Sequence, residues 1–468
     1  MIWRSGTQIV GQMIAWGSTF LVIRILSPGD YGLFAMTQVI LVLLNMLNGY
    51  GLASALIQKA DADPRSIRQL FGMLILLNLG LGAIQFAAAP LAASYFRHPE
   101  VAGLLRVQAL LYITTPFIAL PYALLSRRMD FKSQAAVNLI SAVAGAIVAL
   151  TGAWSGWGVW TLVFAPMALF ATRALGLTIA ARTWILPSFD FRGAGGMARY
   201  GGLMATGQLF WFVQSQADVF IAGRHFDAHT LGIYTTSLFL AQIFVAKFVP
   251  PLNDVAFSAY ARIQDDIASV AAAFLKSVRI ILLVAMPFYL GLAVVAEPLV
   301  HVILGAKWVE TGPVVALLAL AMPFMTLQVL FAPACDARGK PGISARNSAT
   351  GAAILATAFL AGVHWGVIGL ATSWIVAYPV YLAISAWRTL PVIGVRWGVL
   401  LAAVSTPVLA SVAMALVLVI VDRALPPLAP LPRLTLLIAI GAATYGAWLL
   451  LFARSAVDEI IGLLRNRG

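Results

Sequence analysis

Charge is scarce in this sequence: only 10% of its 468 residues are Asp, Glu, Lys or Arg, whereas 61% are hydrophobic. A soluble globular protein has about 25% charged residues, so the composition excludes that class. Cysteine is nearly absent, because Cys335 is the only one. This excludes an intrachain disulfide and a cysteine-based metal cluster. The pattern G-x-x-x-x-G-K-[ST] is also missing, which excludes ATP binding through a P-loop.

Long apolar runs fill the chain instead. A bilayer-spanning helix needs about 20 mostly apolar residues, and the hydrophobic content suffices for roughly fourteen of them. We therefore expect an all-α integral membrane protein with about 14 transmembrane helices. No cleavable signal is expected, since the first apolar run leads directly into a second. The predicted spans are 6–26, 32–57, 70–95, 104–125, 134–154, 158–180, 200–223, 231–251, 274–296, 313–333, 345–363, 366–387, 397–420 and 434–453.

An internal repeat organises these spans. Residues 11–34 and residues 207–234 both open on Gly-Gln, run through an apolar span to an arginine, and close on a turn followed by glycine. Their opening glycines are 196 positions apart, and their closing glycines, Gly32 and Gly232, are 200 apart. A repeat of this length predicts two equivalent halves, as in many transporters with a substrate path between the halves.

The repeat predicts the domain organisation. The first six spans form an N-terminal lobe, residues 1–185, and the next six form a C-terminal lobe, residues 200–390. Residues 186–199 contain proline and several glycines and read as a cytoplasmic linker. Residues 391–468 hold two additional helices that have no counterpart in the first half.

Lysine and arginine are unevenly distributed among the loops. If the N-terminus is cytoplasmic, 21 of them fall on the inner side and 6 on the outer side. Cytoplasmic loops of membrane proteins carry this excess, so we expect both termini in the cytoplasm. The net charge of +13 is explained in the same way, and no nucleic-acid partner is expected.

Polar residues follow helical stripes inside the predicted spans. Gln12 matches Gln208 in the repeat, and Trp211 shares the stripe of Gln208. Such residues are costly in hydrocarbon and normally face a bundle interior or a cavity. We interpret them as the lining of a hydrated lumen suited to sugars; hydrogen bonding between helices without a cavity is the alternative. The neighbouring spans add Gln38, Asn45, Asn48, Asn78, Gln85 and Gln242.

Several charged residues lie within or at the ends of spans, Arg173 among them, and four others are candidate site residues. Arg24 and Arg224 occupy corresponding places at the outer ends, and Asp218 lies about two turns deeper. Lys247 lies about 24 Å along its helix from the outer turn. These cations would suit a phosphorylated substrate. The alternatives are that Arg24, Arg224 and Lys247 snorkel to the interfaces and that Asp218 is a structural partner of a cation.

Several segments carry a family resemblance. RILSPGDYGLFAM, ALIQK, PLAASYFRHPEV, ALLSRRMDFK and QADVFIAGRHFDAHTLGIY resemble bacterial polysaccharide exporters of the Wzx type, especially the branch of the colanic acid exporters. The resemblance covers about the first 390 residues. It implies two six-helix lobes in a V shape, a fold shared with MATE antiporters and the flippase MurJ. The central cations of the family match Arg24, Arg224 and Lys247 in kind, whereas Val22 stands where the first half would repeat Asp218.

The resemblance also implies a task. Such a protein is no enzyme and needs no cofactor; it moves undecaprenyl-pyrophosphate-linked oligosaccharide across the bacterial inner membrane by alternating access. A polysaccharide polymerase and a chain-length regulator are the expected protein partners, beside membrane lipids. A proton or sodium gradient as the energy source is left open. The alternatives are a cation-coupled drug antiporter, which predicts an acidic lumen, and a membrane glycosyltransferase or polymerase, which predicts a catalytic base and a large outer loop.

Overall fold

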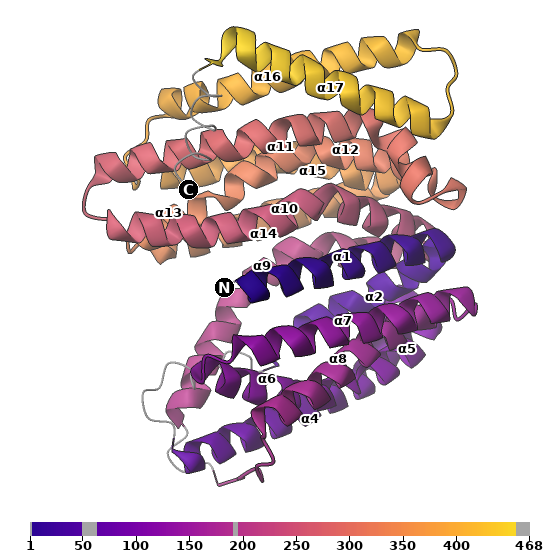
Figure 1. Cartoon of the computed structure of the whole chain (residues 1–468), viewed down its shortest axis with the longest axis vertical. Helices are drawn as coiled ribbons and strands as arrows, with labels where there is room; N and C mark the ends of the chain where they lie inside the picture. Colours follow the sequence, from indigo (N-terminus) through magenta and orange to yellow (C-terminus); the bar gives the residue numbers. More distant parts are fainter. Residues whose placement is uncertain (1, 49–62, 191–194, 455–468) are drawn as a thin grey trace. The chain divides into compact units, whose positions relative to one another are not determined.

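The computed structural model describes residues 2–48, 63–190 and 195–454, and the side chains of residues 2–9 and 195–208 are not described. Within these ranges the chain is helical, and its contacts divide it into two compact units, Met1–Gly232 and Ile233–Gly468 (Figure 1).

The first unit is built from helices that pack mainly on α7, α8 and α4. The helix α7 packs against α1 and α8, α6 packs against α8 and α4, and α2 packs against α9. The elements of this unit are α1 (Ile2–Ile25), α2 (Pro28–Asn45), α4 (Pro64–Phe96), α5 (Glu100–Gln108), α6 (Leu111–Arg127), α7 (Phe131–Trp154), α8 (Val159–Ala181) and α9 (Gly195–His225).

The second unit is organised around α11, which packs against α12, α16 and α17, while α15 packs against α12 and α14. The first five residues of α10 belong to the first unit. The elements are α10 (Ala228–Arg262), α11 (Ile267–Ile303), η1 (Ala306–Trp308), α12 (Thr311–Val329), α13 (Phe331–Ala337), α14 (Pro341–Gly362), η2 (Val363–Trp365), α15 (Gly366–Thr389), α16 (Trp397–Ala424) and α17 (Pro430–Phe452).

Local sequence signals start these helices. Ser27 caps α2 through a capping box with Asp30, and Pro28 follows at the first helical position. Asp130 caps α7, because the backbone N–H and the hydroxyl of Ser133 both donate to its carboxylate, at 3.1 and 2.7 Å. A capping oxygen satisfies an N–H that has no partner within the helix. Short turns between apolar helices therefore suffice to fix where each helix begins.

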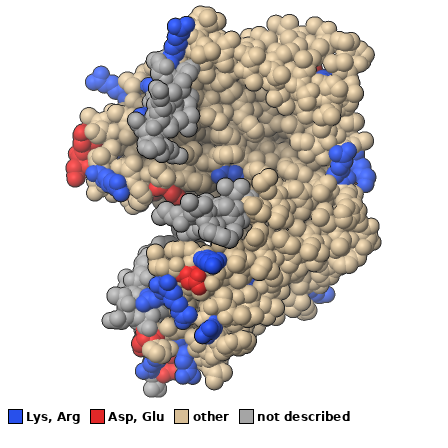
Figure 2. All heavy atoms as spheres, viewed as in Figure 1, with Lys and Arg blue, Asp and Glu red and all other residues tan. Residues whose placement is uncertain are grey.

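The helices are suited to a bilayer. Among the described residues ten helical segments are long and apolar enough to cross a membrane, and Val10–Ile25 is a shorter apolar stretch. Figure 2 shows the same property on one face, where charged side chains gather near helix ends and the surface between them is almost uncharged. The predicted all-α membrane fold is therefore confirmed.

Three predicted spans differ from the structure in detail. The helix of the second span, expected over 32–57, ends at Asn45, and residues 49–57 lie outside the described residues. The tenth span, expected over 313–333, is interrupted at Leu330 between α12 and α13. The fourth span, expected as one helix over 104–125, is interrupted at Ala109 and Leu110, between α5 and α6.

Of the predicted linker, residues 186–190 lie against the start of α4: Arg65 forms an ion pair of 3.0 Å with Asp190, and the N–H of Ser188 donates to the carbonyl of Arg68 at 2.8 Å. The contact division at Gly232 places α9 with the first six spans, because α9 packs on α2 and α4. The lobe boundaries at residues 185 and 200 stay a prediction.

The two copies of the repeat meet where α2 and α10 begin. A Cβ atom on Gly32 would lie 1.8 Å from the carbonyl oxygen of Ala228, and one on Gly232 would lie 1.8 Å from the carbonyl oxygen of Pro28. Only glycine permits so close an approach of two backbones. The contact is reciprocal, because the residues on one side are the repeat equivalents of those on the other.

Candidate functional site

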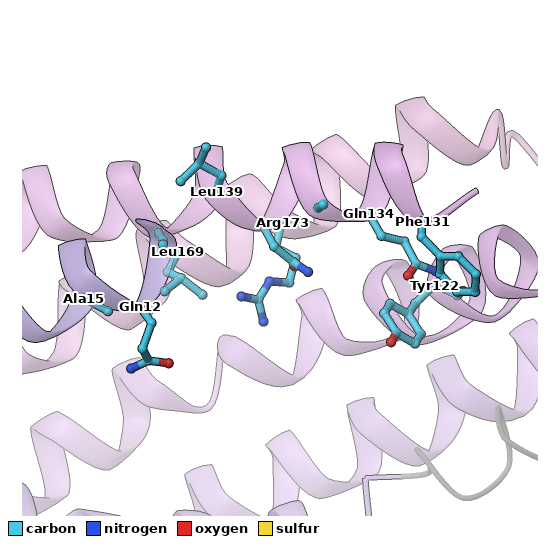
Figure 3. A pocket seen from close by; sticks show the side chains of 12 residues that line it. Gln12, Ala15, Tyr122, Phe131, Gln134, Leu139, Leu169 and Arg173 are labelled. Carbon is cyan, nitrogen blue, oxygen red and sulfur yellow. The ribbon is translucent and has the colours of Figure 1, made fainter. Parts of the chain in front are cut away.

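A pocket of about 360 Å³ lies within the first unit, among α1, α6, α7 and α8. Leu139 and Leu169 form apolar walls, and Figure 3 shows Gln12 and Arg173 projecting into the space between the helices. Functional pockets for small ligands have volumes of about 300–1,000 Å³. The polar residues that line this pocket are Gln12, Tyr122, Gln134, Asn138 and Arg173.

Arg173 is the charged residue of this lining. It stands on α8 fourteen residues after Val159 and eight before Ala181, which places it about 21 Å and about 12 Å from the two ends of the helix. Its guanidinium carbon lies 5.7 Å from the centre of the Phe170 ring, a cation–π arrangement. A half-buried arginine at this depth is costly in a membrane, which makes Arg173 a candidate functional residue.

Close packing of α7 on α8 brings Arg173 to the pocket. A Cβ atom on Gly145 would lie 3.0 Å from Cβ of Leu169, and one on Gly176 would lie 2.7 Å from Cγ1 of Val137. Both contacts depend on the missing side chain of a glycine, and they occur on either side of Arg173 along α8. The two glycines thus hold α8 at the distance at which Arg173 faces the lining residues of α7.

The amide groups of the pocket come from two helices. Gln134 on α7 is buried, and its Nε2 donates to the carbonyl of Tyr122 at 3.2 Å and to Oγ of Ser126 at 2.9 Å. It therefore ties α7 to α6. Asn138, one turn further along α7, and Gln12 on α1 are exposed at the pocket surface. These two amides offer donors and acceptors that a ligand can use.

Of the ten residues predicted for the lumen, Gln12 is the one that lines this pocket. The side chain of its repeat partner Gln208 lies outside the described residues. Gln38 is half-buried on α2, and Asn45 is exposed near the end of the same helix. On α9 and α10, Trp211 is 52% exposed, Gln242 is half-buried and Lys247 is exposed. Their place in a lumen stays a prediction.

Two other amides of the predicted stripes, Asn78 and Gln85, form hydrogen bonds within the first unit instead. Asn78 is buried, and its Nδ2 donates to the carbonyl of Asn48 at 2.9 Å. Gln85 is also buried; its Nε2 donates to the carbonyl of Leu105 at 2.8 Å, and its Oε1 accepts from the hydroxyl of Tyr112 at 3.1 Å. For these residues the structure favours hydrogen bonding between helices over a lumen lining.

Three charged residues predicted for the lumen lie toward the C-terminal ends of α1 and α9, and their surroundings differ. Arg224 donates to the carbonyls of Ser94 and Tyr95, at 3.3 and 2.5 Å, and lies over the Tyr95 ring. These carbonyls lie in the last turn of α4, where a cation also interacts favourably with the helix dipole. Arg24 is exposed, whereas Asp218 is buried at 1% exposure. Arg224 thus has a structural contact, and a substrate role for it stays a prediction.

A second cavity, of about 320 Å³, lies in the second unit among α11, α16 and α17. Its lining is apolar apart from Tyr445, whose hydroxyl donates to the carbonyl of Leu283 at 2.7 Å. A cavity of this composition offers no hydrogen bonds to a sugar. Within the described ranges no group of three His, Cys, Asp or Glu residues could hold a metal ion.

Comparison with known proteins places the chain among polysaccharide transport proteins. The family described as polysaccharide biosynthesis protein matches residues 21–313, which is more than half of the chain. The succinoglycan biosynthesis transport protein ExoT of Rhizobium meliloti is 27% identical over 70% of this chain and 67% of its own length. The lipopolysaccharide biosynthesis protein WzxC of Escherichia coli is 23% identical over 64% of this chain and 61% of its own length.

Solved structures share the fold. The lipid II flippase MurJ in an inward closed conformation superposes with a TM-score of 0.79 at 13% identity, over 98% of this chain and all of that chain. An inward-facing multidrug resistance transporter of the MATE family and the MOP superfamily superposes with a TM-score of 0.63 at 16% identity, over 84% of this chain and 98% of its own. At such identities the likeness concerns the fold.

Proposed function

The chain belongs to the polysaccharide biosynthesis protein family, the Wzx-like transporters of the superfamily that also holds MurJ and the MATE antiporters, and from this premise we propose that it flips lipid-linked oligosaccharides. It is a multi-pass membrane transporter and not an enzyme. The substrate that we propose is an undecaprenyl-pyrophosphate-linked repeat unit, carried from the cytoplasmic to the outer leaflet of the bacterial inner membrane for a surface polysaccharide.

The family match over residues 21–313 is the observation that carries this proposal. The MurJ-like fold supports it, because that protein is itself a lipid flippase. A cation in a pocket with amide groups also suits an anionic glycolipid better than a cationic drug. A cation-coupled antiporter would depend on acids within the spans, and Asp218 is the acid that the sequence offers there.

We further propose fourteen membrane-spanning helices. Ten segments qualify by length and composition, and one of them, Pro341–Thr389, contains two helices, α14 and α15. The helices α1, α2 and α9 supply the remaining three. The positive-inside rule supports cytoplasmic termini for this arrangement. A polysaccharide polymerase and a chain-length regulator are the protein partners that we propose.

We infer a mechanism of alternating access. On one side of the membrane the first and second copies of the repeat touch at Gly32 and Gly232, and the Tyr95 ring stacks on the Phe220 ring with centroids 4.5 Å apart. These contacts join α2 and α4 to α9 and α10. Opening a path on that side requires these contacts to break. A path toward the other side of the membrane can be open while the contacts remain formed.

Deletion of the gene tests the proposed function. Lipid-linked repeat units should accumulate in the cytoplasmic leaflet, and surface polysaccharide should disappear. Both should revert when the wild-type gene is supplied on a plasmid. A deletion strain with normal surface polysaccharide and no accumulated lipid-linked units would contradict the proposal. Loss of polymer with fully externalised single repeat units would favour a polymerase.

A further inference from the structure

We propose that the pocket around Arg173 is an oxyanion-binding subsite that holds one anionic group of the transported glycolipid together with an adjoining sugar. The anionic group is either a phosphate of the lipid carrier or the carboxylate of an acidic sugar, which share the same chemistry. This inference rests on the proposed function and adds a site that lies outside the cations predicted from the sequence.

The guanidinium group of Arg173 has the chemistry that recognises an oxyanion. Arginine stays charged at any physiological pH, and its planar fork of N–H groups matches the two oxygens of a phosphate or a carboxylate. The guanidinium carbon lies 5.7 Å from the centre of the Phe170 ring. Arginine is favoured over lysine wherever a phosphate or a carboxylate is recognised through two parallel hydrogen bonds.

The composition of the pocket favours an anionic ligand that carries hydroxyl groups. The described residues that line it include one arginine, three amides and one tyrosine, and none of them is Asp or Glu. A site for a cation would need carboxylates, and a site for an apolar drug would need few amides. Gln12 and Asn138 can donate to and accept from sugar hydroxyls next to the anionic group. The volume of about 360 Å³ suits one such unit rather than a whole oligosaccharide.

The pocket lies nearer to the Ala181 end of α8 than to its Val159 end. Arg173 is about 12 Å from the Ala181 end of α8, and Gln134 is three residues from the start of α7. At this end Arg128 donates to the carbonyl of Ala181 at 3.1 Å and fastens α6 to α8. The loops at this end carry the basic residues that predict a cytoplasmic location. The pocket is therefore placed for a substrate that is loaded from the cytoplasm.

The test measures equilibrium binding to the purified full-length protein in lipid nanodiscs. Undecaprenyl pyrophosphate without sugar is the phosphate probe, a hyaluronan tetrasaccharide is the carboxylate probe, and maltotetraose is the neutral probe. The variants are Arg173→Gln and Arg173→Lys. The matched control is Arg106→Gln, since Arg106 also lies over a phenylalanine ring, Phe86 at 5.3 Å, but outside the pocket.

We expect Arg173→Gln to weaken binding of at least one anionic probe tenfold or more, because a charge-assisted bidentate contact is lost. Arg173→Lys should lose less, since the charge remains with altered geometry. Arg106→Gln should bind like the wild type. A loss for the lipid probe assigns the anion to the carrier phosphate, and a loss for the hyaluronan probe assigns it to a sugar carboxylate. The proposal is overturned if the wild type binds neither anionic probe, or if Arg173→Gln binds both as tightly as the wild type.

A second measurement leaves Arg173 in place, in case its variants do not fold. A cysteine at Ala135, which lines the pocket, reacts with a maleimide in a Cys335→Ser background. A saturating anionic probe should slow this reaction at least fivefold, and an unchanged rate would place the ligand elsewhere. If neither experiment finds a ligand at this pocket but the deletion strain accumulates lipid-linked units, the proposed function stands without this site. If binding depends on Arg173 but the deletion strain shows no defect, the site stands and the proposed function is wrong.

Discussion

Gly32 and Gly232 occupy equivalent positions in two touching helices, and each stands where any side chain would collide with the backbone of the other copy. The obstacle is Ala228 for Gly32 and Pro28 for Gly232, and the distance from the missing Cβ to the carbonyl oxygen is 1.8 Å in both cases. Pro28 and Ala228 are themselves 200 positions apart, as the two glycines are. The contact is thus symmetric in sequence as well as in space, which is the property of a two-fold interface.

This contact predicts the effect of a single methyl group. Gly32→Ala should destabilise the contact by about 1–3 kcal/mol, because the overlapping atoms belong to a backbone that cannot turn aside. Gly29→Ala in the same helix turn is the matched control, since the nearest atom to its Cβ would be Oγ of Ser27 at 3.8 Å. Thermal unfolding in detergent measures both. Equal stability of the two variants would show that the helices separate without cost.

The stacked rings of Tyr95 and Phe220 predict that a crosslink between these two positions blocks transport. Cysteines at Tyr95 and Phe220, joined by a short bismaleimide, should abolish export of polysaccharide, whereas the uncrosslinked double variant should keep part of it. The control pair is Trp160 and Phe164, which also stack, at 5.7 Å, but lie on one helix. Crosslinking that pair should leave export intact. Normal export with the Tyr95–Phe220 pair fully crosslinked would mean that this end does not open.

Lys247 tests the prediction that cations within the spans bind a phosphorylated substrate. Lys247→Ala should reduce export while leaving the protein abundant, because an exposed side chain contributes little packing. Lys247→Arg should retain part of the activity, since its charge survives. Lys340→Ala, another exposed lysine, serves as the control. Surface polysaccharide is measured relative to the amount of protein in the membrane. Wild-type export from Lys247→Ala would assign this lysine to snorkelling.

Membrane orientation can be read from two exposed positions. In a Cys335→Ser background a cysteine at Asp265 should be shielded from an impermeant maleimide in intact cells, and a cysteine at Ser155 should react. Ser133 and Ser269 are poorer probes, because their hydroxyls bond to the capping residues Asp130 and Asp266. Permeabilised cells give the total reactivity of each position. Labelling at Asp265 but not at Ser155 would reverse the topology.

The cap of α7 predicts a dependence of stability on pH. Hydrogen bonds from Ser133 lower the pKa of Asp130 below its ordinary value. A carboxylate whose pKa is lowered in the folded state stabilises the fold above a pH of about 4. This stabilisation is lost as the pH falls through the pKa of the folded state. Asp130→Asn should therefore lower the melting temperature at pH 7, and the difference from the wild type should shrink as the pH falls below about 4. A difference that does not change with pH would show that the carboxylate charge is not involved.

The sequence predicted the helices well, because an apolar run of 20 residues in a chain with so little charge has few other ways to fold. Seven of the fourteen predicted spans lie entirely within a helix of the structure, and four of these helices, α4, α9, α10 and α11, extend beyond the predicted span at both ends. The interruption at Ala109 and Leu110 was not predicted, since neither residue is glycine or proline. Capping residues such as Asp130 mark where helices begin, so those boundaries were accessible in principle.

The site was harder to predict than the helices. Periodicity shows which residues share one face of a helix, but the face alone does not tell which helix lies opposite. Asn78 and Gln85 were therefore interpreted as lumen residues although they bond to neighbouring helices. Arg173 was noticed only as a charge in or near a span. Its distance of more than two turns from both ends of an apolar helix was the signal that could have singled it out.

The paired glycines bear on how a chain of this length came about. In a symmetric homodimer a residue beside the two-fold axis contacts the equivalent neighbourhood of its own copy, so one glycine in a half-length ancestor would serve both sides at once. Gene duplication and fusion would turn that single requirement into two, at Gly32 and at Gly232. A change at one glycine leaves the steric clash at the other in place, so we expect selection to act on each glycine separately. Homologues should therefore retain both glycines even where the rest of the repeat has diverged.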